Sequence, residues 1–186
     1  MTVIAVGHTH TKFSRLLKSI PDSFDVIKVF NGDDHREDGS IIVPNDLNGR
    51  DVAMYAEGLK HTDSDRLVFL NDDVQHIHED WWKLADMFLN KWEHHPDLIG
   101  STNMSSWVDY NKLPNEKEVE RAKKQGRDPL FVRTSAFMCT RQFFTSTWEK
   151  ANGSAQAFEK STLKEAGRVH VIPAQWCYDS NVRNYV

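Results

Sequence analysis

Two adjacent carboxylates follow directly on an apolar segment in the middle of the chain. Residues 67–70 read Leu-Val-Phe-Leu, and Asn71, Asp72 and Asp73 come next. A continuous apolar run bounded by polar residues is typical of a strand that is buried on both faces of a parallel sheet. Ligands of open α/β sheets bind beyond the carboxyl ends of the strands. We therefore expect Asp72 and Asp73 at the mouth of a binding crevice.

Neighbouring carboxylates in a crevice repel each other and are costly to desolvate, so they need a partner of opposite charge. Mg2+ and Mn2+ prefer hard oxygen ligands, and they commonly take one or two carboxylates together with substrate phosphates. The segment Asn71-Asp72-Asp73 supplies such a set. Adjacent acids also occur in ordinary turns, but their position after a buried strand in mid-chain favours a divalent-cation site.

Strands and helices alternate around this junction, which predicts an α/β domain with a mostly parallel central sheet flanked by helices. The late elements are also compatible with one antiparallel strand. The polar stretch 101–128 interrupts the alternation, and a long excursion inside a compact domain is more often functional than idle. The expected strands are residues 3–7, 26–30, 41–43, 66–70, 98–100, 131–139 and 169–172, and the expected helices are residues 11–19, 51–60, 80–93, 141–148 and 154–166.

The composition is that of one soluble domain, with 186 residues, 39% hydrophobic and 27% charged. A net charge of -4 gives no electrostatic footprint for nucleic acid. Cys139 and Cys177 are widely separated, which fits buried thiols in a reducing compartment. The start of the chain does not read as a signal peptide, and no segment approaches the roughly 18 apolar residues of a membrane span. These features predict a cytoplasmic protein without a transmembrane segment.

In its order of motifs the chain resembles the GT-A glycosyltransferases, especially those of the family 2 type, within the nucleotide-diphospho-sugar transferase superfamily. The metal-binding DxD motif of that family follows a buried strand, as Asn71-Asp72-Asp73 does here with Asn in the first position. The resemblance covers most of the chain and implies a single Rossmann-like GT-A domain over 1–186, with a nucleotide-binding part at about 1–100 and an acceptor-side part at about 101–186. The matching segments are 3–7 for the first nucleotide-binding strand, 29–34 for the acidic turn, 48–59 for the helix before the metal strand, and 135–144 for the acceptor side.

The resemblance implies a metal-dependent transfer of sugar from a nucleotide diphosphate, with uridine diphosphate expected, to a saccharide or glycoconjugate acceptor. Mn2+ or Mg2+ would stabilise the departing diphosphate as the anomeric carbon gains oxocarbenium character. Asp73 is expected to be a direct metal ligand, and Asp72 to reach the metal, a coordinating water or the ribose. His170, in the last expected strand, is the expected third ligand, with Asp179 as the rival. His76 and His78 are interpreted as surface histidines.

The resemblance also implies the remaining site residues. Sugars have apolar CH faces that stack on aromatic rings, so aromatic side chains of the polar stretch are expected to form an acceptor platform. Each residue also has a purely structural interpretation, as a turn glycine, a solvated turn acid, an exposed arginine or a packing aromatic. The expected nucleotide-sugar contacts are Val6, Gly7, His8, Asn31, Asp33, Asp34, Arg50 and Asp72, and the expected acceptor contacts are Trp107 and Tyr110.

Inverting members of the family usually carry an acidic pair at the start of a late helix, one member of which is the general base. The corresponding stretch 155–159 reads Ala-Gln-Ala-Phe-Glu and has one acid, Glu159. Either Glu159 is the base in a shifted register, or the mechanism differs. The sequence leaves an inverting and a retaining outcome open.

Other functions stay open as well. A sugar-nucleotide pyrophosphorylase would carry a Gly-rich, basic loop after the first strand, which residues 7–10, Gly-His-Thr-His, do not supply. A haloacid-dehalogenase-type phosphatase would place its aspartates after the first strand. A binding module that keeps the fold and the nucleotide pocket without transferring sugar fits the incomplete acidic pair. The length is also compatible with one domain of a longer polypeptide.

Overall fold

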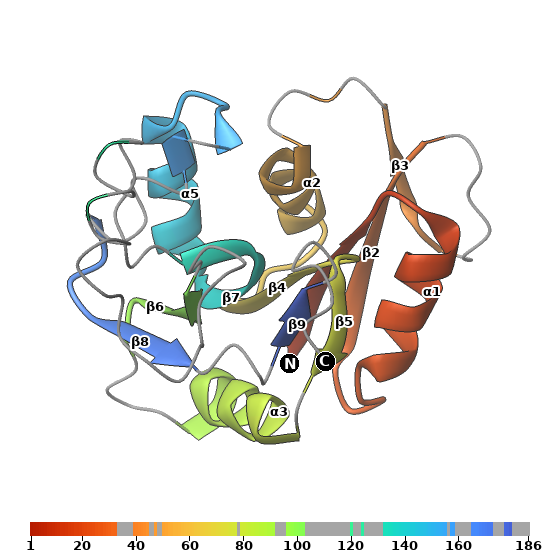
Figure 1. Cartoon of the computed structure of the whole chain (residues 1–186), viewed down its shortest axis with the longest axis horizontal. Coiled ribbons are helices and arrows are strands. Elements are labelled where there is room, and N and C mark those ends of the chain that lie inside the picture. Colours follow the sequence, from red (N-terminus) through yellow and green to blue (C-terminus); the bar gives the residue numbers. More distant parts are fainter. Residues whose placement is uncertain are drawn as a thin grey trace.

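A seven-stranded sheet with helices on both faces forms the body of the protein, and a two-stranded sheet lies beside it (Figure 1). The structure is a computed structural model. It describes residues 1–32, 39–44, 47, 50–77, 79–91, 96–102, 120, 124, 132–155, 157–158, 165–172 and 177–179.

The main sheet has the strand order β3-β2-β1-β4-β7-β6-β8. Strand β7 is antiparallel to both of its neighbours, and the other adjacent pairs are parallel. The mostly parallel sheet and the late antiparallel strand are confirmed. The strands are β1 (Thr2–Gly7), β2 (Asp25–Asn31), β3 (Ile41–Val43), β4 (Arg66–Asn71), β6 (Leu98–Thr102), β7 (Val132–Thr140) and β8 (Val169–Ile172).

Helices α1 (His10–Ser19) and α3 (Glu79–Asp86) cover one face of the sheet, and α2 (Arg50–Leu59) and α5 (Arg141–Lys150) cover the other (Figure 1). The helix expected over 80–93 is divided, because a π-helical segment, η1 (Met87–Lys91), follows α3. Of the helix expected over 154–166, the described part includes its first turn, in which the N–H of Phe158 donates to the carbonyl of Ser154 at 2.9 Å.

The two apolar layers of the core follow from the alternation of side chains along each strand. In β1, Val3 and Ala5 belong to the layer under α1 and α3, and Ile4 and Val6 belong to the layer under α2 and α5. All four are fully buried. Burial on both faces explains why these strands read as unbroken apolar runs.

A stack of aromatic rings joins the two halves of the sheet. The ring of Phe69 in β4 lies 4.7 Å, centroid to centroid, from that of Phe137 in β7 and 4.7 Å from that of Phe144 in α5. Phe158 packs on Phe144 at 5.2 Å. The late strand and helix are thereby fixed against the strand that ends in the acid pair.

The chain path makes a topological switch point at the ends of β1 and β4. After β1 the chain proceeds through α1 to β2 and β3 on one side, and then returns through α2 to β4 on the other side of β1. Ligands of open α/β sheets bind at such a topological switch point. Because Val6 of β1 pairs with Asn71 of β4, the residues that follow the two strands lie side by side there.

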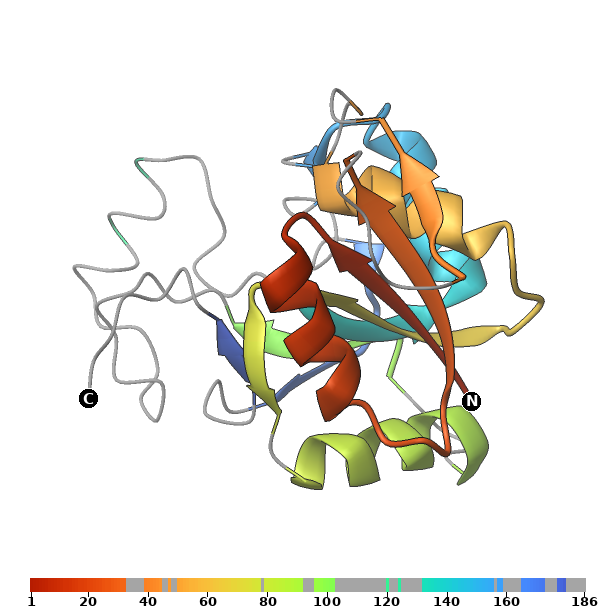
Figure 2. The ribbon, with the colours of Figure 1, turned by 90° about the vertical axis from the view of Figure 1, so that its right-hand side faces the viewer.

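A two-stranded sheet, which the sequence did not predict, follows the acid pair. Strand β5 (Val74–Ile77) pairs antiparallel with β9 (Cys177–Asp179) and lies next to α1 (Figure 2). The two strands are about 100 residues apart in the sequence, so no local pattern reports their pairing. The pairing places the acid pair in a tight turn between β4 and β5.

Gly7 is required for space at the end of β1. A Cβ atom at this position would lie 2.7 Å or less from three atoms of the Phe13 side chain, which is fully buried and packs on Phe30. We predict that Gly7→Ala lowers the free energy of unfolding by about 1–3 kcal/mol, the usual cost of overpacking a core. Urea unfolding measures this loss. In the double variant with Phe13→Ala the loss should be smaller than the sum of the single losses, because alanine lacks two of the three contacting atoms. Simple additivity would contradict this explanation.

Candidate functional site

Four segments bring polar side chains together at the switch point. They are the loop after β1, the beginning of α1, the first turn of α2, and the turn between β4 and β5. Hydrogen bonds and ion pairs connect them into one cluster, which we call the β1–β4 cluster. Its members are His8, Thr9, Lys12, Asp51, Asn71, Asp72 and Asp73.

Asp72 is turned into the protein and supports the loop before α1. It is 2% exposed, and its Oδ2 accepts the backbone N–H groups of His8 at 2.8 Å and Thr9 at 2.9 Å. Burial raises the pKa of this carboxyl above its usual value, and the two N–H groups offset part of that effect. Asp72 therefore ties the end of β4 to the beginning of α1.

The two hydrogen bonds of Asp72 lead to a stability prediction. An asparagine oxygen can still accept from the N–H groups of His8 and Thr9 and avoids burying a charge, so Asp72→Asn should be at least as stable as the wild type at pH 7. Asp72→Ala leaves both groups without this acceptor and should lose about 2 kcal/mol or more in free energy of unfolding. Urea denaturation of both variants makes the comparison. Equal losses in the two would refute the assigned role.

Asp73 is the more exposed member of the acid pair. Its side chain is 23% exposed, and its Oδ1 lies 3.0 Å from the Nζ of Lys12, the third residue of α1. Its backbone N–H donates to the Oδ1 of Asn71 at 3.1 Å, which holds the turn. Asp73 is therefore the partly exposed carboxylate of the pair, and it forms an ion pair with the first turn of α1.

His8 and Asp51 form a hydrogen-bonded pair that Asn71 orients. The Nδ2 of Asn71 donates to the Oδ2 of Asp51 at 2.7 Å, and the Oδ1 of Asp51 is hydrogen-bonded to the Nε2 of His8. This hydrogen bond is the largest cause that raises the pKa of His8, and the charges of Asp51, Asp72 and Asp73 add to it, against the effect of burial. A positive imidazolium is thus favoured beside the acid pair.

The raised pKa of His8 has a consequence for stability. The folded protein holds this proton more tightly than the unfolded chain does, so the contribution is full below the ordinary pKa of 6.5 and is lost as pH rises through the raised value. Asp51→Asn should therefore destabilise the protein most at low pH. Urea unfolding from pH 5.5 to 9 tests this expectation. Asp80→Asn, at an exposed ion pair with Lys83, is the control and should show no such trend. A pH-independent effect of Asp51→Asn would contradict the prediction.

The sequence interpretation placed His8 and Asp73 in the site, but it missed Asp51, the partner of His8, and Lys12, the partner of Asp73. Asp51 lies in the first turn of α2, where an acid is ordinarily explained by the helix dipole. Lys12 reads as a solvated residue of an amphipathic helix. The sequence could have indicated Lys12 and Asp51 only through their positions, because both lie in the first turn of a helix that follows a strand and begins at the switch point.

The ligands that this site offers fit a divalent cation that is also bound by a substrate phosphate. Among the residues that the structure describes, no group of three or more His, Cys, Asp or Glu side chains could hold a metal ion. Mg2+ and its analogues, however, are commonly held by one or two carboxylates plus substrate phosphates and water. Asp73 supplies a hard, partly exposed carboxylate for that arrangement.

The strand register distinguishes the two candidates for a further ligand. His170 pairs with Ile99, which in turn pairs with Met138 opposite Val68, so His170 lies three strands from β4 and level with its middle. At about 4.8 Å per strand this is a long way from Asp73. Asp179 pairs with Val74, the residue after Asp73. The register favours Asp179 over His170.

The other expected contacts are placed only in part. Val6 is fully buried at the end of β1, and Asn31 is 9% exposed at the end of β2. Arg50 begins α2, but its side chain is outside the described part of the structure. The following residues lie outside the described residues altogether: Asp33, Asp34, His78, Trp107, Tyr110 and Glu159.

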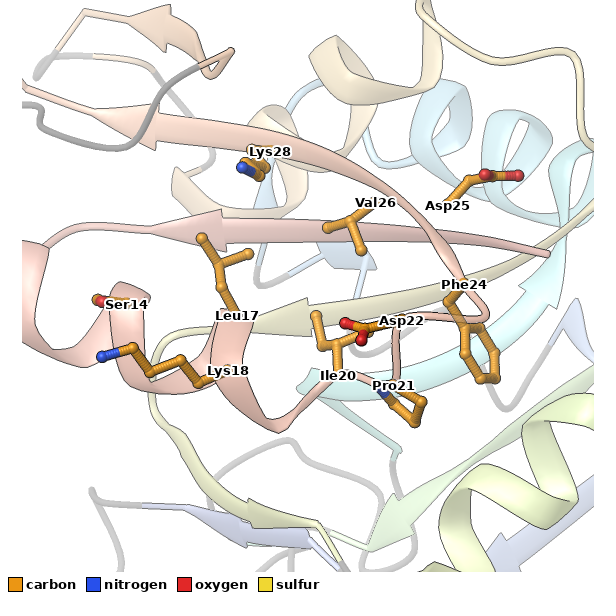
Figure 3. A pocket seen from close by; sticks show the side chains of 10 residues that line it. All are labelled: Ser14, Leu17, Lys18, Ile20, Pro21, Asp22, Phe24, Asp25, Val26 and Lys28. Atoms are coloured by element: carbon orange, nitrogen blue, oxygen red, sulfur yellow. The ribbon is translucent and has the colours of Figure 1, made fainter.

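An open groove of about 500 Å³ lies at the other end of the sheet (Figure 3). Its lining comes from the second half of α1, the loop after it, and the beginning of β2, including Lys18, Phe24 and Lys28. Parallel strands begin at this edge, so the groove is separate from the β1–β4 cluster.

Among the described residues, no helix has the length and the hydrophobicity of a membrane span. Cys139 is a free, buried thiol, as expected.

No family model and no curated protein matches the sequence. Solved structures match the fold at low identity. A mannosyltransferase from Pyrobaculum calidifontis in complex with GDP-Man and Mn2+ has a TM-score of 0.54 at 14% identity, over 95% of this chain and 56% of that chain. A glycosyltransferase involved in the glycosylation of the major capsid of PBCV-1 has a TM-score of 0.53 at 12% identity, over 93% and 81%.

A protein described as a glucose-1-phosphate thymidylyltransferase, from Bacillus anthracis, matches with a TM-score of 0.52 at 12% identity, over 92% of this chain and 85% of that chain. This chain therefore spans little more than half of the mannosyltransferase and most of the thymidylyltransferase. Identities this low establish the fold alone. The chain has the α/β GT-A fold of the nucleotide-diphospho-sugar transferases.

Proposed function

We propose that this protein is a glycosyltransferase that moves a sugar from a nucleoside diphosphate, with uridine diphosphate as the nucleotide, to a saccharide or glycoconjugate acceptor. The observation that carries the proposal is the place of Asp73, a partly exposed carboxylate at the switch point of a GT-A fold. The mannosyltransferase that matches this fold was solved in complex with GDP-Man and Mn2+.

The cluster suggests how the donor would be held. The diphosphate would lie beyond the ends of β1 and β4, where Asp73 would bind Mn2+ or Mg2+. That cation supplies positive charge to the leaving diphosphate. The pKa of His8 is raised, chiefly by its hydrogen bond to Asp51, and the protonated ring would add positive charge at this edge. Asp72 would act through the loop that it braces, since its Oδ2 accepts two backbone N–H groups.

Other roles remain proposals from the sequence. Residues of the first and second strand ends and the start of α2 would contact the nucleoside and sugar, and the acceptor half would supply the platform and the base. The division at about residue 100 is part of the same proposal. The residues are Val6, Gly7, Asn31, Asp33, Asp34 and Arg50 on the donor side, and Trp107, Tyr110 and Glu159 on the acceptor side.

A nucleotidyltransferase is the second candidate, because the thymidylyltransferase shares the fold over a larger share of its length. Such an enzyme joins a sugar phosphate to a nucleoside triphosphate and releases pyrophosphate. The loop Gly7-His8-Thr9 lacks the Gly-rich basic pattern that this chemistry uses, which favours the glycosyltransferase. A module that binds nucleotide sugar without reaction is the third.

Product analysis separates the three. The full chain is incubated with UDP-glucose, UDP-galactose and GDP-mannose, with and without Mn2+, and released nucleoside diphosphate is measured. Slow release that depends on Mn2+ supports the glycosyltransferase. Pyrophosphate release from a nucleoside triphosphate and a sugar phosphate would instead identify a nucleotidyltransferase. Binding without release in either assay would identify the module.

A further inference from the structure

The ammonium group of Lys12 lies beside Asp73, the carboxylate to which the proposed function assigns a divalent cation. The Nζ of Lys12 lies 3.0 Å from the Oδ1 of Asp73, and the two side chains are 36% and 23% exposed. The pair joins α1 to the turn after β4. A divalent cation at Asp73 would meet a positive charge within hydrogen-bonding distance of the same carboxylate.

The other acids of the β1–β4 cluster are held differently. Asp72 accepts backbone N–H groups of the loop before α1, and Asp51 is held by the side chains of His8 and Asn71. A lysine is a compact charge on a flexible four-carbon stem. Rotation of its own side chain can therefore move the Lys12 ammonium away from Asp73.

Electrostatic repulsion determines how Lys12 affects the binding of a divalent cation at Asp73. The ammonium and a divalent cation repel each other at such short range, so Lys12 weakens cation binding to the free protein. A diphosphate brings negative oxygens to the same edge of the sheet and offers the displaced ammonium a new partner. Cation and nucleotide should then each favour the binding of the other.

We propose that Lys12 is the resident counter-cation of Asp73, which a divalent cation displaces and which then binds an oxygen of the donor diphosphate. The proposal rests on the proposed function, because it takes Asp73 as the metal ligand. It assigns to Lys12 a contact with the donor and makes metal binding and nucleotide binding interdependent.

The first measurement is Mn2+ binding to the nucleotide-free protein, followed by the electron paramagnetic resonance signal of free Mn2+. Lys12→Met, which keeps the length and removes the charge, should bind Mn2+ about tenfold more tightly, since a like charge beside the ligand is removed. Lys18→Met is the matched control on the same helix. Lys18 lines the remote groove (Figure 3), so its affinity for Mn2+ should equal that of the wild type.

The second measurement is calorimetric binding of UDP at saturating Mn2+. Here Lys12→Met should bind about tenfold more weakly, the scale of one hydrogen bond to a charged group. The opposite signs in the two titrations are the signature of the exchange. A merely structural ion pair would not tighten Mn2+ binding.

Unchanged or weaker Mn2+ binding by Lys12→Met would overturn the displacement, and unchanged UDP binding would overturn the contact with the diphosphate. Asp73→Ala separates this inference from the proposed function. If Asp73→Ala no longer binds Mn2+ while Lys12→Met binds Mn2+ and UDP as the wild type does, the inference about Lys12 is wrong and the metal site at Asp73 is supported. If Asp73→Ala keeps the wild-type affinity for Mn2+, both the inference about Lys12 and the metal site at Asp73 are wrong.

Discussion

Replacing Asp73 by alanine should abolish the Mn2+-dependent binding of the nucleotide-sugar donor and leave the protein folded. The side chain lies at a strand end and is 23% exposed, and the hydrogen bond that holds the turn uses the backbone N–H of Asp73 rather than its carboxylate. A direct metal ligand should count for more than an outer partner of the metal, whose loss costs about 10–100-fold. We therefore expect donor affinity at saturating Mn2+ to fall by about 100-fold or more.

Calorimetry with UDP and Mn2+ measures the loss, and thermal unfolding of the same preparation checks the fold. Asp80→Ala is the matched control, because Asp80 is an aspartate of α3 that pairs with Lys83 on the surface. It should bind the donor as the wild type does. Wild-type binding and turnover by Asp73→Ala would refute the assignment of the metal to this carboxylate.

Glu159→Gln should lower sugar transfer by about 100-fold or more, the scale of general-base catalysis. The expectation comes from the sequence, in which Glu159 is the acid nearest to the place where inverting relatives carry their base. Its neighbour in the sequence, Phe158, is buried and packs on Phe144 and Phe137. A base acts on the acceptor hydroxyl, so donor affinity should barely change.

Transfer and donor binding are measured on one preparation, and the anomeric configuration of the product is determined. Glu165→Gln serves as the control, since Glu165 forms a surface ion pair with Lys150. It should transfer normally. Near-normal transfer by Glu159→Gln, or a product that retains configuration, would remove Glu159 from this role and indicate a retaining mechanism.

The layered α/β architecture, and the strand end at which the candidate site lies, can be read from the order of the residues alone. Residues 3–7 and 67–70 are buried on both faces of the sheet, and such burial excludes charge from these runs, so they are readable without knowing the neighbouring strands. The abrupt change at Asn71 marks the carboxyl end of β4 for the same reason. Alternation with helices then implies parallel strands, whose ends meet at one edge.

Asp72 and Asp73 differ in their surroundings, and this difference arises from the tertiary structure. The two residues are chemically identical neighbours, yet one is 2% exposed and takes the N–H groups of His8 and Thr9, while the other is more exposed and pairs with Lys12. Those partners lie more than 60 positions earlier in the chain. A one-dimensional pattern does not record which of two adjacent carboxylates a distant helix will meet.

The pairings of His8 with Asp51 and of β5 with β9 were likewise decided by the fold. Asp51 meets His8 because α2 returns the chain to the other side of β1, and Asp179 lies opposite Val74 because two short strands pair across about 100 residues. The sequence of a short strand gives little local indication of its partner, and a polar contact between distant residues, such as His8 and Asp51, leaves no pattern in the sequence. Local propensity and burial thus specify the elements, whereas the charge balance of the site depends on which strand ends the topology brings together.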